Sequence, residues 1–150
     1  MRETKSRALS MCKGERWVYG DLRHYNRNPH TEKWTIHDPD TGLETDIDER
    51  TVGQYTGLHD RKDREIYEGD ILFVEFSDKS GGYYLVGWND KTAAWGIMDR
   101  YEYRSIHDGY DFAEFKNHTL LAFFKEAIIF EVAGNIHDNP ELMNIPKAKK

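Results

Sequence analysis

The sequence contains one cysteine, four prolines and no apolar run long enough to cross a membrane. Because Cys12 stands alone, the chain can form neither an intrachain disulfide nor a thiolate metal cluster. The first residues are basic but lack the apolar segment of a signal peptide. We therefore expect a cytoplasmic protein and no association with a membrane.

The sequence also lacks the common signatures of nucleotide and metal chemistry. It has no GxxxxGK[ST] loop, no GxGxxG and no HExxH, and none of its seven histidines forms a pair four residues apart. Glu68-Gly69-Asp70 places two carboxylates around a glycine. That pattern is typical of the turn before the first strand of an SH3-like barrel, where glycine supplies an unusual φ and aspartate accepts backbone N–H groups. We predict no catalytic, metal-binding or cofactor-binding residues, no cofactor and no enzymatic activity.

Aromatic residues are plentiful: 4 Trp, 9 Tyr and 7 Phe make up 13% of the 150 residues. Disordered chains are poor in such residues, so a folded core is expected. Segments of β-forming residues alternate with turn clusters, at 17–25, 33–37, 43–47, 51–55, 71–76, 83–88, 93–98 and 128–132. Helical signals are confined to 120–126, with Thr119 as N-cap, and to a turn at 139–143.

These segments predict a mostly β protein: a small SH3-like barrel or meander around 66–98, with additional N-terminal strands and one or two short helices. We divide the chain into a basic N-terminal arm or first strand at 1–15, one β-rich domain at 16–146 and a disordered tail at 147–150. Within the domain, strands at 16–60 could precede a barrel at 65–136. The residues expected in the core are Trp17, Trp34, Val52, Tyr55, Ile71, Phe73, Val86, Trp88 and Val132.

The net charge of −6 is unevenly distributed along the chain. Residues 1–16 carry +3 and residues 141–150 carry +2, which leaves −11 for 17–140. An acidic body repels a phosphate backbone, so nucleic acid is an unfavourable partner. The basic ends are interpreted as solvated tails.

Segment 99–118 mixes tyrosines with carboxylates and has no clear secondary-structure pattern. Tyrosine buries a large area at low entropic cost and is common at interfaces, although the same side chains could fold back over the core. The candidate interaction surface consists of Tyr101, Tyr103, Tyr110, Phe112, Asp108 and Asp111.

Two sequence blocks, Thr51-Val52-Gly53-Gln54-Tyr55-Thr56-Gly57-Leu58 and Ile66-Tyr67-Glu68-Gly69-Asp70-Ile71, resemble the YopX family of bacteriophage and prophage proteins. The resemblance extends to Arg16-Trp17-Val18-Tyr19-Gly20 and returns at Glu131-Val132-Ala133-Gly134-Asn135-Ile136 and Asn139-Pro140-Glu141-Leu142. It implies a phage-encoded, mostly β protein of no established activity, with no catalytic motif to carry over.

Three hypotheses about function follow. We favour a non-enzymatic phage accessory protein that acts through protein–protein interaction or self-assembly, with an unidentified host or phage protein as partner and a homo-oligomer as a further expectation. The first alternative is a weak nucleic-acid-binding small barrel with basic ends as clamps. The second alternative, an acid-dependent hydrolase, is the least favoured because it needs an enclosing cleft.

Overall fold

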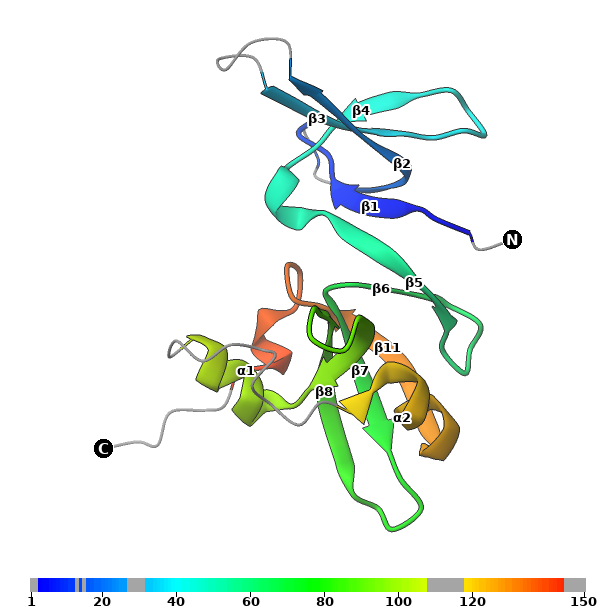
Figure 1. The fold of residues 1–150 in the computed structure, drawn as a ribbon, viewed down its shortest axis with the longest axis vertical. Coiled ribbons are helices and arrows are strands. Elements are labelled where there is room, and N and C mark those ends of the chain that lie inside the picture. The colour runs from blue at the N-terminus through cyan, green and yellow to red at the C-terminus, as the bar shows by residue number, and fades with distance from the viewer. Residues whose placement is uncertain (1–2, 13, 15, 27–31, 108–117, 145–150) are drawn as a thin grey trace. The chain divides into compact units, whose positions relative to one another are not determined.

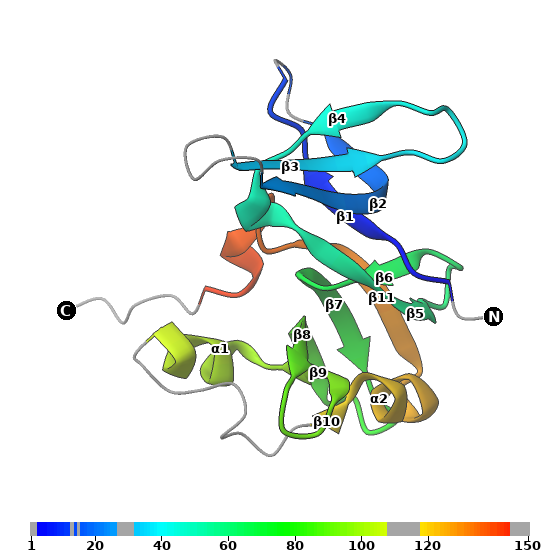
Figure 2. The ribbon, with the colours of Figure 1, turned by 45° about the horizontal axis from the view of Figure 1, so that its top comes forward.

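The computed structural model describes residues 3–12, 14, 16–26, 32–107 and 118–144. The chain divides into two compact units, Met1–Gly57 and Leu58–Lys150. Figure 1 shows the strands and helices of both units, and Figure 2 shows them from a second direction.

A six-stranded antiparallel sheet begins in the first unit, with the order β4-β3-β2-β1-β5-β6. Its strands are β1 (Ser6–Leu9), β2 (Trp17–Asn26), β3 (Glu32–His37), β4 (Glu44–Asp46), β5 (Gly53–His59) and β6 (Glu65–Tyr67). A 3-10 turn, η1 (Glu49–Thr51), separates β4 from β5. The boundary between the two units falls within β5, so the end of that strand and β6 belong to the second unit.

The first unit has a small core of its own. Ala8, Ile36 and Ile47 are buried, and Val18, Trp34 and Val52 pack against them. The hydroxyl of Thr51 accepts a hydrogen bond from the Leu9 amide at 2.8 Å, and this bond ties η1 to β1.

The second unit contains a five-stranded antiparallel sheet with the order β10-β9-β8-β7-β11. Its strands are β7 (Asp70–Glu75), β8 (Gly81–Asn89), β9 (Ala94–Met98), the two-residue β10 (His118–Thr119) and β11 (Ile129–Asn135). The helices α1 (Arg100–His107) and α2 (Leu120–Glu126) and the 3-10 turn η3 (Pro140–Leu142) complete it. In both ribbon views, α1 and α2 lie on opposite sides of β8 (Figures 1 and 2).

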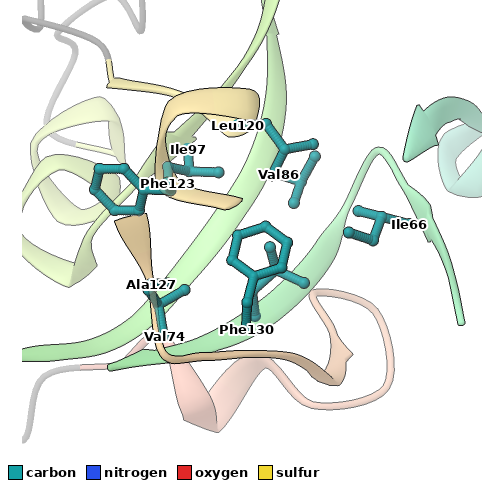
Figure 3. Close-up of a cluster of buried hydrophobic side chains, with 9 residues drawn as sticks. Ile66, Val74, Val86, Ile97, Leu120, Phe123, Ala127 and Phe130 are labelled. Carbon is teal, nitrogen blue, oxygen red and sulfur yellow. The ribbon is translucent and has the colours of Figure 1, made fainter. Parts of the chain in front are cut away.

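Two apolar clusters cover the two faces of this sheet, because successive side chains of a strand point to opposite faces. The larger cluster brings Leu120 and Phe123 of α2 against the sheet, as Figure 3 shows. Its buried members are Ile66, Leu72, Val74, Val86, Ile97, Leu120, Phe123, Ala127 and Phe130. The smaller cluster consists of Ile71, Leu85, Met98 and Met143, with Tyr103 packed against it.

The prediction of a mostly β chain is confirmed, and so is the meander between 66 and 98. Strands β7, β8 and β9 pair in sequence order, with Phe73 opposite Tyr83 and Trp88 opposite Trp95. Of the two arrangements expected there, a small SH3-like barrel or a meander, the described residues form the meander and no closed barrel. Within the described residues both sheets have an open strand order, and β10 and β11 stand at opposite ends of the second sheet.

The outer edge of β11 is covered by the loop that follows β5. The Arg61 amide donates to the Phe130 carbonyl at 3.0 Å, and the Asp60 carboxylate accepts from the Val132 amide at 2.9 Å. The late apolar strand thus finds one neighbour in β7 and the other in this loop.

The turn at Glu68-Gly69-Asp70 has the predicted structural role. Gly69 adopts φ of +89°, a left-handed conformation that favours glycine. The carboxylate of Asp70 accepts a hydrogen bond from the Tyr67 amide at 2.8 Å. Gly69 and the Asp70 carboxylate therefore shape the turn that leads into β7.

The predicted core is only partly correct. Tyr55, Ile71 and Val86 are buried, but Trp17, Trp34, Val52, Phe73 and Val132 are half-buried. Trp88 is 39% exposed, because it lies beside the turn between β8 and β9 and contacts Trp95 edge-on, with ring centroids 5.1 Å apart. Alternation within a strand shows which residues share a face, but not how far a second layer extends over that face.

Helix α2 has the predicted bounds and the predicted cap: the Thr119 hydroxyl accepts from the Ala122 amide at 3.1 Å. We expect Thr119→Ala to lower the free energy of unfolding by about 1 kcal/mol, because one amide of the first turn loses its acceptor. Thr119→Ser keeps the hydroxyl and should stay near wild type. Urea unfolding of both variants measures the effect, and equal losses in the two would contradict the capping role.

No helix among the described residues is long and apolar enough to cross a membrane.

Candidate interaction surface

A groove of about 380 Å³ lies where β8 and α1 begin, within the second unit. It is lined by Gly81, Gly82, Tyr83, Tyr84, Asp99, Arg100 and Tyr101. We call these seven residues the β8–α1 groove. Three of its members are tyrosines, one is an acid and one is an arginine, so it combines aromatic surface with one charge of each sign.

A pair of glycines, Gly81 and Gly82, forms one wall of the groove. Gly81 adopts φ of +140°, and a Cβ at this position would collide with the carbonyl oxygen of Val74 on β7. At Gly82 a Cβ would meet nothing within 4 Å. The first residues of β8 are therefore bare backbone on one wall of the groove.

Asp99 also lines the groove, and its hydrogen bonds start helix α1. Its carboxylate accepts a hydrogen bond from the Glu102 amide at 2.9 Å, and its carbonyl accepts one from the Tyr103 amide at 3.0 Å. Capping of this kind ends β9 at Met98 and turns the chain into a helix.

Arg100 is held in place by two contacts. Its Nε donates to the carbonyl oxygen of Leu142 at 2.8 Å, and its guanidinium lies 5.1 Å from the centroid of the Tyr83 ring. Tyr83 in turn packs on Phe73, with ring centroids 5.4 Å apart. Arg100 thus connects the start of α1 with Tyr83 of β8 and with Leu142 of η3.

The two described tyrosines of α1 have different environments. Tyr101 is 74% exposed and lines the groove, whereas Tyr103 is half-buried against the cluster of Ile71, Leu85, Met98 and Met143. Tyr101 is therefore accessible to a partner, whereas Tyr103 contributes to the core. The remaining predicted surface residues, Asp108, Tyr110, Asp111 and Phe112, lie outside the described residues.

Burial raises the pKa of Tyr84, and the negative charges of Asp99 and Glu102 raise it further. Burial also raises the pKa of Tyr103. Both phenols therefore remain protonated hydrogen-bond donors at neutral pH.

The histidine and cysteine side chains are the remaining candidates for chemistry. His24 stacks on Trp34, with ring centroids 4.0 Å apart, and its Nε2 lies 2.7 Å from a Glu32 carboxylate oxygen. Within the part of the chain that the structure describes, no three His, Cys, Asp or Glu side chains are grouped as metal ligands. Cys12 is exposed.

The part of the groove formed by β8 was not predicted from the sequence. The available signal was Gly81-Gly82 directly before Tyr83-Tyr84 and, 15 residues further on, Asp99 before a tyrosine-rich segment. By itself, a Gly-Gly pair between two β-forming runs indicates only a turn. What the pattern could not indicate was that β9 ends early and leaves this part of β8 beside a helix.

The described residues thus form a mostly β protein of two units, with a tyrosine-lined groove at the start of one helix. The family pattern described as YopX protein matches residues 7–144. The chain therefore belongs to the YopX family. The crystal structure of protein EF1440 from Enterococcus faecalis is similar to this chain at a TM-score of 0.48 and 18% sequence identity, covering 96% of this chain and 100% of that one. No curated protein matches the chain in sequence.

Proposed function

We propose that this chain is a non-enzymatic phage or prophage accessory protein that works by binding a basic protein through the β8–α1 groove. The setting rests on the resemblance to the YopX family, and the mode of action rests on the groove. The observation that carries the proposal is Tyr101, a large aromatic side chain that is 74% exposed beside an acidic helix start.

The charge of the second unit supports a basic partner. Residues 58–150 contain 12 basic and 17 acidic side chains, for a net charge of −5. Opposite potentials speed the encounter of two proteins, and aromatic side chains provide the area that is buried on contact. A host or phage protein that handles DNA is a suitable partner, because such proteins are often basic. The same charge disfavours a nucleic-acid partner.

Self-assembly is the other form that this function could take. Strand β4 stands at one end of the first sheet, and on its outer edge the Asp46 carbonyl already accepts from the Met11 amide at 2.9 Å. The part of this edge before Asp46 could pair with a second copy.

We expect Tyr101→Ser to abolish most partner binding while leaving the fold intact, because an exposed side chain contributes about 0.5 kcal/mol or less to stability. The measurement is a pull-down from nuclease-treated bacterial lysate with wild type and variant. Tyr19→Ser is the matched control, since Tyr19 is an exposed tyrosine of the first unit. Tyr103 is left unchanged because it packs in the core.

Equal recovery of the same partners by wild type and Tyr101→Ser would contradict the proposal. Retention of duplex DNA by the wild type at about 150 mM salt would favour the nucleic-acid alternative instead. Light scattering of the two proteins separates self-association from a foreign partner, because only self-association raises the mass of the purified chain.

A further inference from the structure

Half of β8 has no described strand beside it on one side. Strand β7 pairs with β8 from Gly81 to Leu85, whereas β9 pairs with it only from Leu85 to Asn89. On the β9 side, no described strand lies opposite residues 81–84. The reason is the Asp99 cap, which turns the chain into α1 one residue after β9 ends.

Some backbone N–H and C=O groups of residues 81–84 face the side where β9 would continue. The hydrogen bond from the Phe76 amide to the Ser80 carbonyl marks a bonded pair of the β7–β8 ladder, and such pairs alternate with non-bonded ones. Counting along β8, Gly82 and Tyr84 direct their N–H and C=O groups to β7. Gly81 and Tyr83 direct theirs away from β7, to the side where β9 would continue.

There is room for an added strand beside residues 81–84 of β8. The β8–α1 groove, about 380 Å³, runs along residues 81–84, and the bare backbone of Gly82 leaves that wall open. Four residues of extended chain span about 13 Å. Arg100, which also lines the groove, is held against the Tyr83 ring and the Leu142 carbonyl.

We propose that an extended segment of a basic protein binds in the β8–α1 groove by adding a strand to β8 along residues 81–84. The proposal rests on the proposed function and specifies how that surface takes its partner. Main-chain hydrogen bonds to Gly81 and Tyr83 provide the affinity, and alternate side chains of the segment provide the specificity.

The charges around the groove determine which segment fits. Asp99 and Glu102 lie close enough to Tyr84 to raise the pKa of its phenol, so their negative charge reaches the groove. The one described cation that lines the groove, Arg100, stacks on Tyr83 and donates to a carbonyl. A strand with Lys or Arg at every second position would meet the acids, and small apolar residues between them would meet the tyrosine rings.

The probe is a short capped peptide in which lysine and valine alternate, added to the full chain and followed by NMR or fluorescence anisotropy. Two further peptides carry N-methyl groups on the lysine amides only or on the valine amides only. In an added strand, alternate amides face β8, so one of the two peptides should bind at least about tenfold more weakly than the other. The less affected peptide is the matched control, because both carry the same number of methyl groups.

On the protein side, Asp99→Asn keeps an acceptor for the Glu102 amide but removes the charge. We expect it to weaken peptide binding about threefold to tenfold at low salt, while Asp90→Asn, in the turn at the far end of β8, leaves binding unchanged. Similar affinities for the two N-methylated peptides would overturn strand addition, and so would no binding of the unmodified peptide at millimolar concentration. Either result would leave the role of Tyr101 in partner capture to be judged by the pull-down.

Discussion

Asp60→Ala should lower the free energy of unfolding by about 3–5 kcal/mol, one of the two largest single-residue effects that we expect. The side chain of Asp60 is fully buried. Its carboxylate accepts hydrogen bonds from the amides of Lys62, Arg64 and Val132 and from Nε of Arg64, all between 2.8 and 2.9 Å. Alanine would leave all four donors without this acceptor at a site that water reaches poorly.

The matched control is Asp78→Ala. Asp78 also accepts from an amide two residues on, that of Ser80, but it is exposed. We expect this control to cost about 1 kcal/mol or less. Chemical denaturation of both variants measures the difference, and equal losses would show that Asp60 does not hold the loop to β11.

A pH series tests the same carboxylate in another way. Burial works to raise the pKa of Asp60, but the hydrogen bonds from Val132, Arg64 and Lys62 outweigh burial and hold the pKa below its usual range. A carboxyl group with a lowered pKa in the folded state stabilises the fold above its unfolded pKa, about 3.9, and that stability is lost as the pH falls through the folded pKa. Asp60→Asn should therefore flatten the acid side of the stability curve. An unchanged curve would argue against the pKa shift.

Phe130→Ala should cost about 3–5 kcal/mol, the second large effect. The ring of Phe130 is fully buried between β11 and α2, with Ile66 and Val86 nearby, and it packs edge-on against Phe124 at a centroid distance of 5.5 Å (Figure 3). Alanine would leave a cavity in the larger core cluster.

Trp88→Ala is the comparison, since tryptophan is larger but this side chain is 39% exposed. We expect a loss of about 1–2 kcal/mol, because part of the ring stays in water in the folded state. Thermal or urea unfolding gives both values. A larger loss for Trp88→Ala than for Phe130→Ala would place the core elsewhere.

Local signals were enough to predict most strands and one helix. Gly81-Gly82 and Asn89-Asp90 separate apolar runs, and the structure has turns next to both pairs. Thr119 was predicted to cap a helix over 120–126, and it does. These features depend on neighbouring residues, so the sequence states them directly.

Long-range features were not predictable in the same way. Whether a meander closes into a barrel depends on whether its outer strands meet, and here Asp60 and Arg61 bind the edge of β11 instead. Helix α1 (Arg100–His107) was not predicted although its residues are amphipathic at helical spacing, because the segment is polar overall and Asp99 was not recognised as its N-cap. The groove depends on both an early end of β9 and this helix, so it could only be seen in three dimensions.

Amide hydrogen exchange of the full chain, with and without the partner retained in the pull-down, shows whether the partner binds along β8. We expect slower exchange on binding at residues 81–84 and at the start of α1, with Gly81 and Tyr83 changing more than Gly82 and Tyr84, whose amides already face β7. Protection confined to strands of the first unit, with no change at residues 81–84, would contradict it.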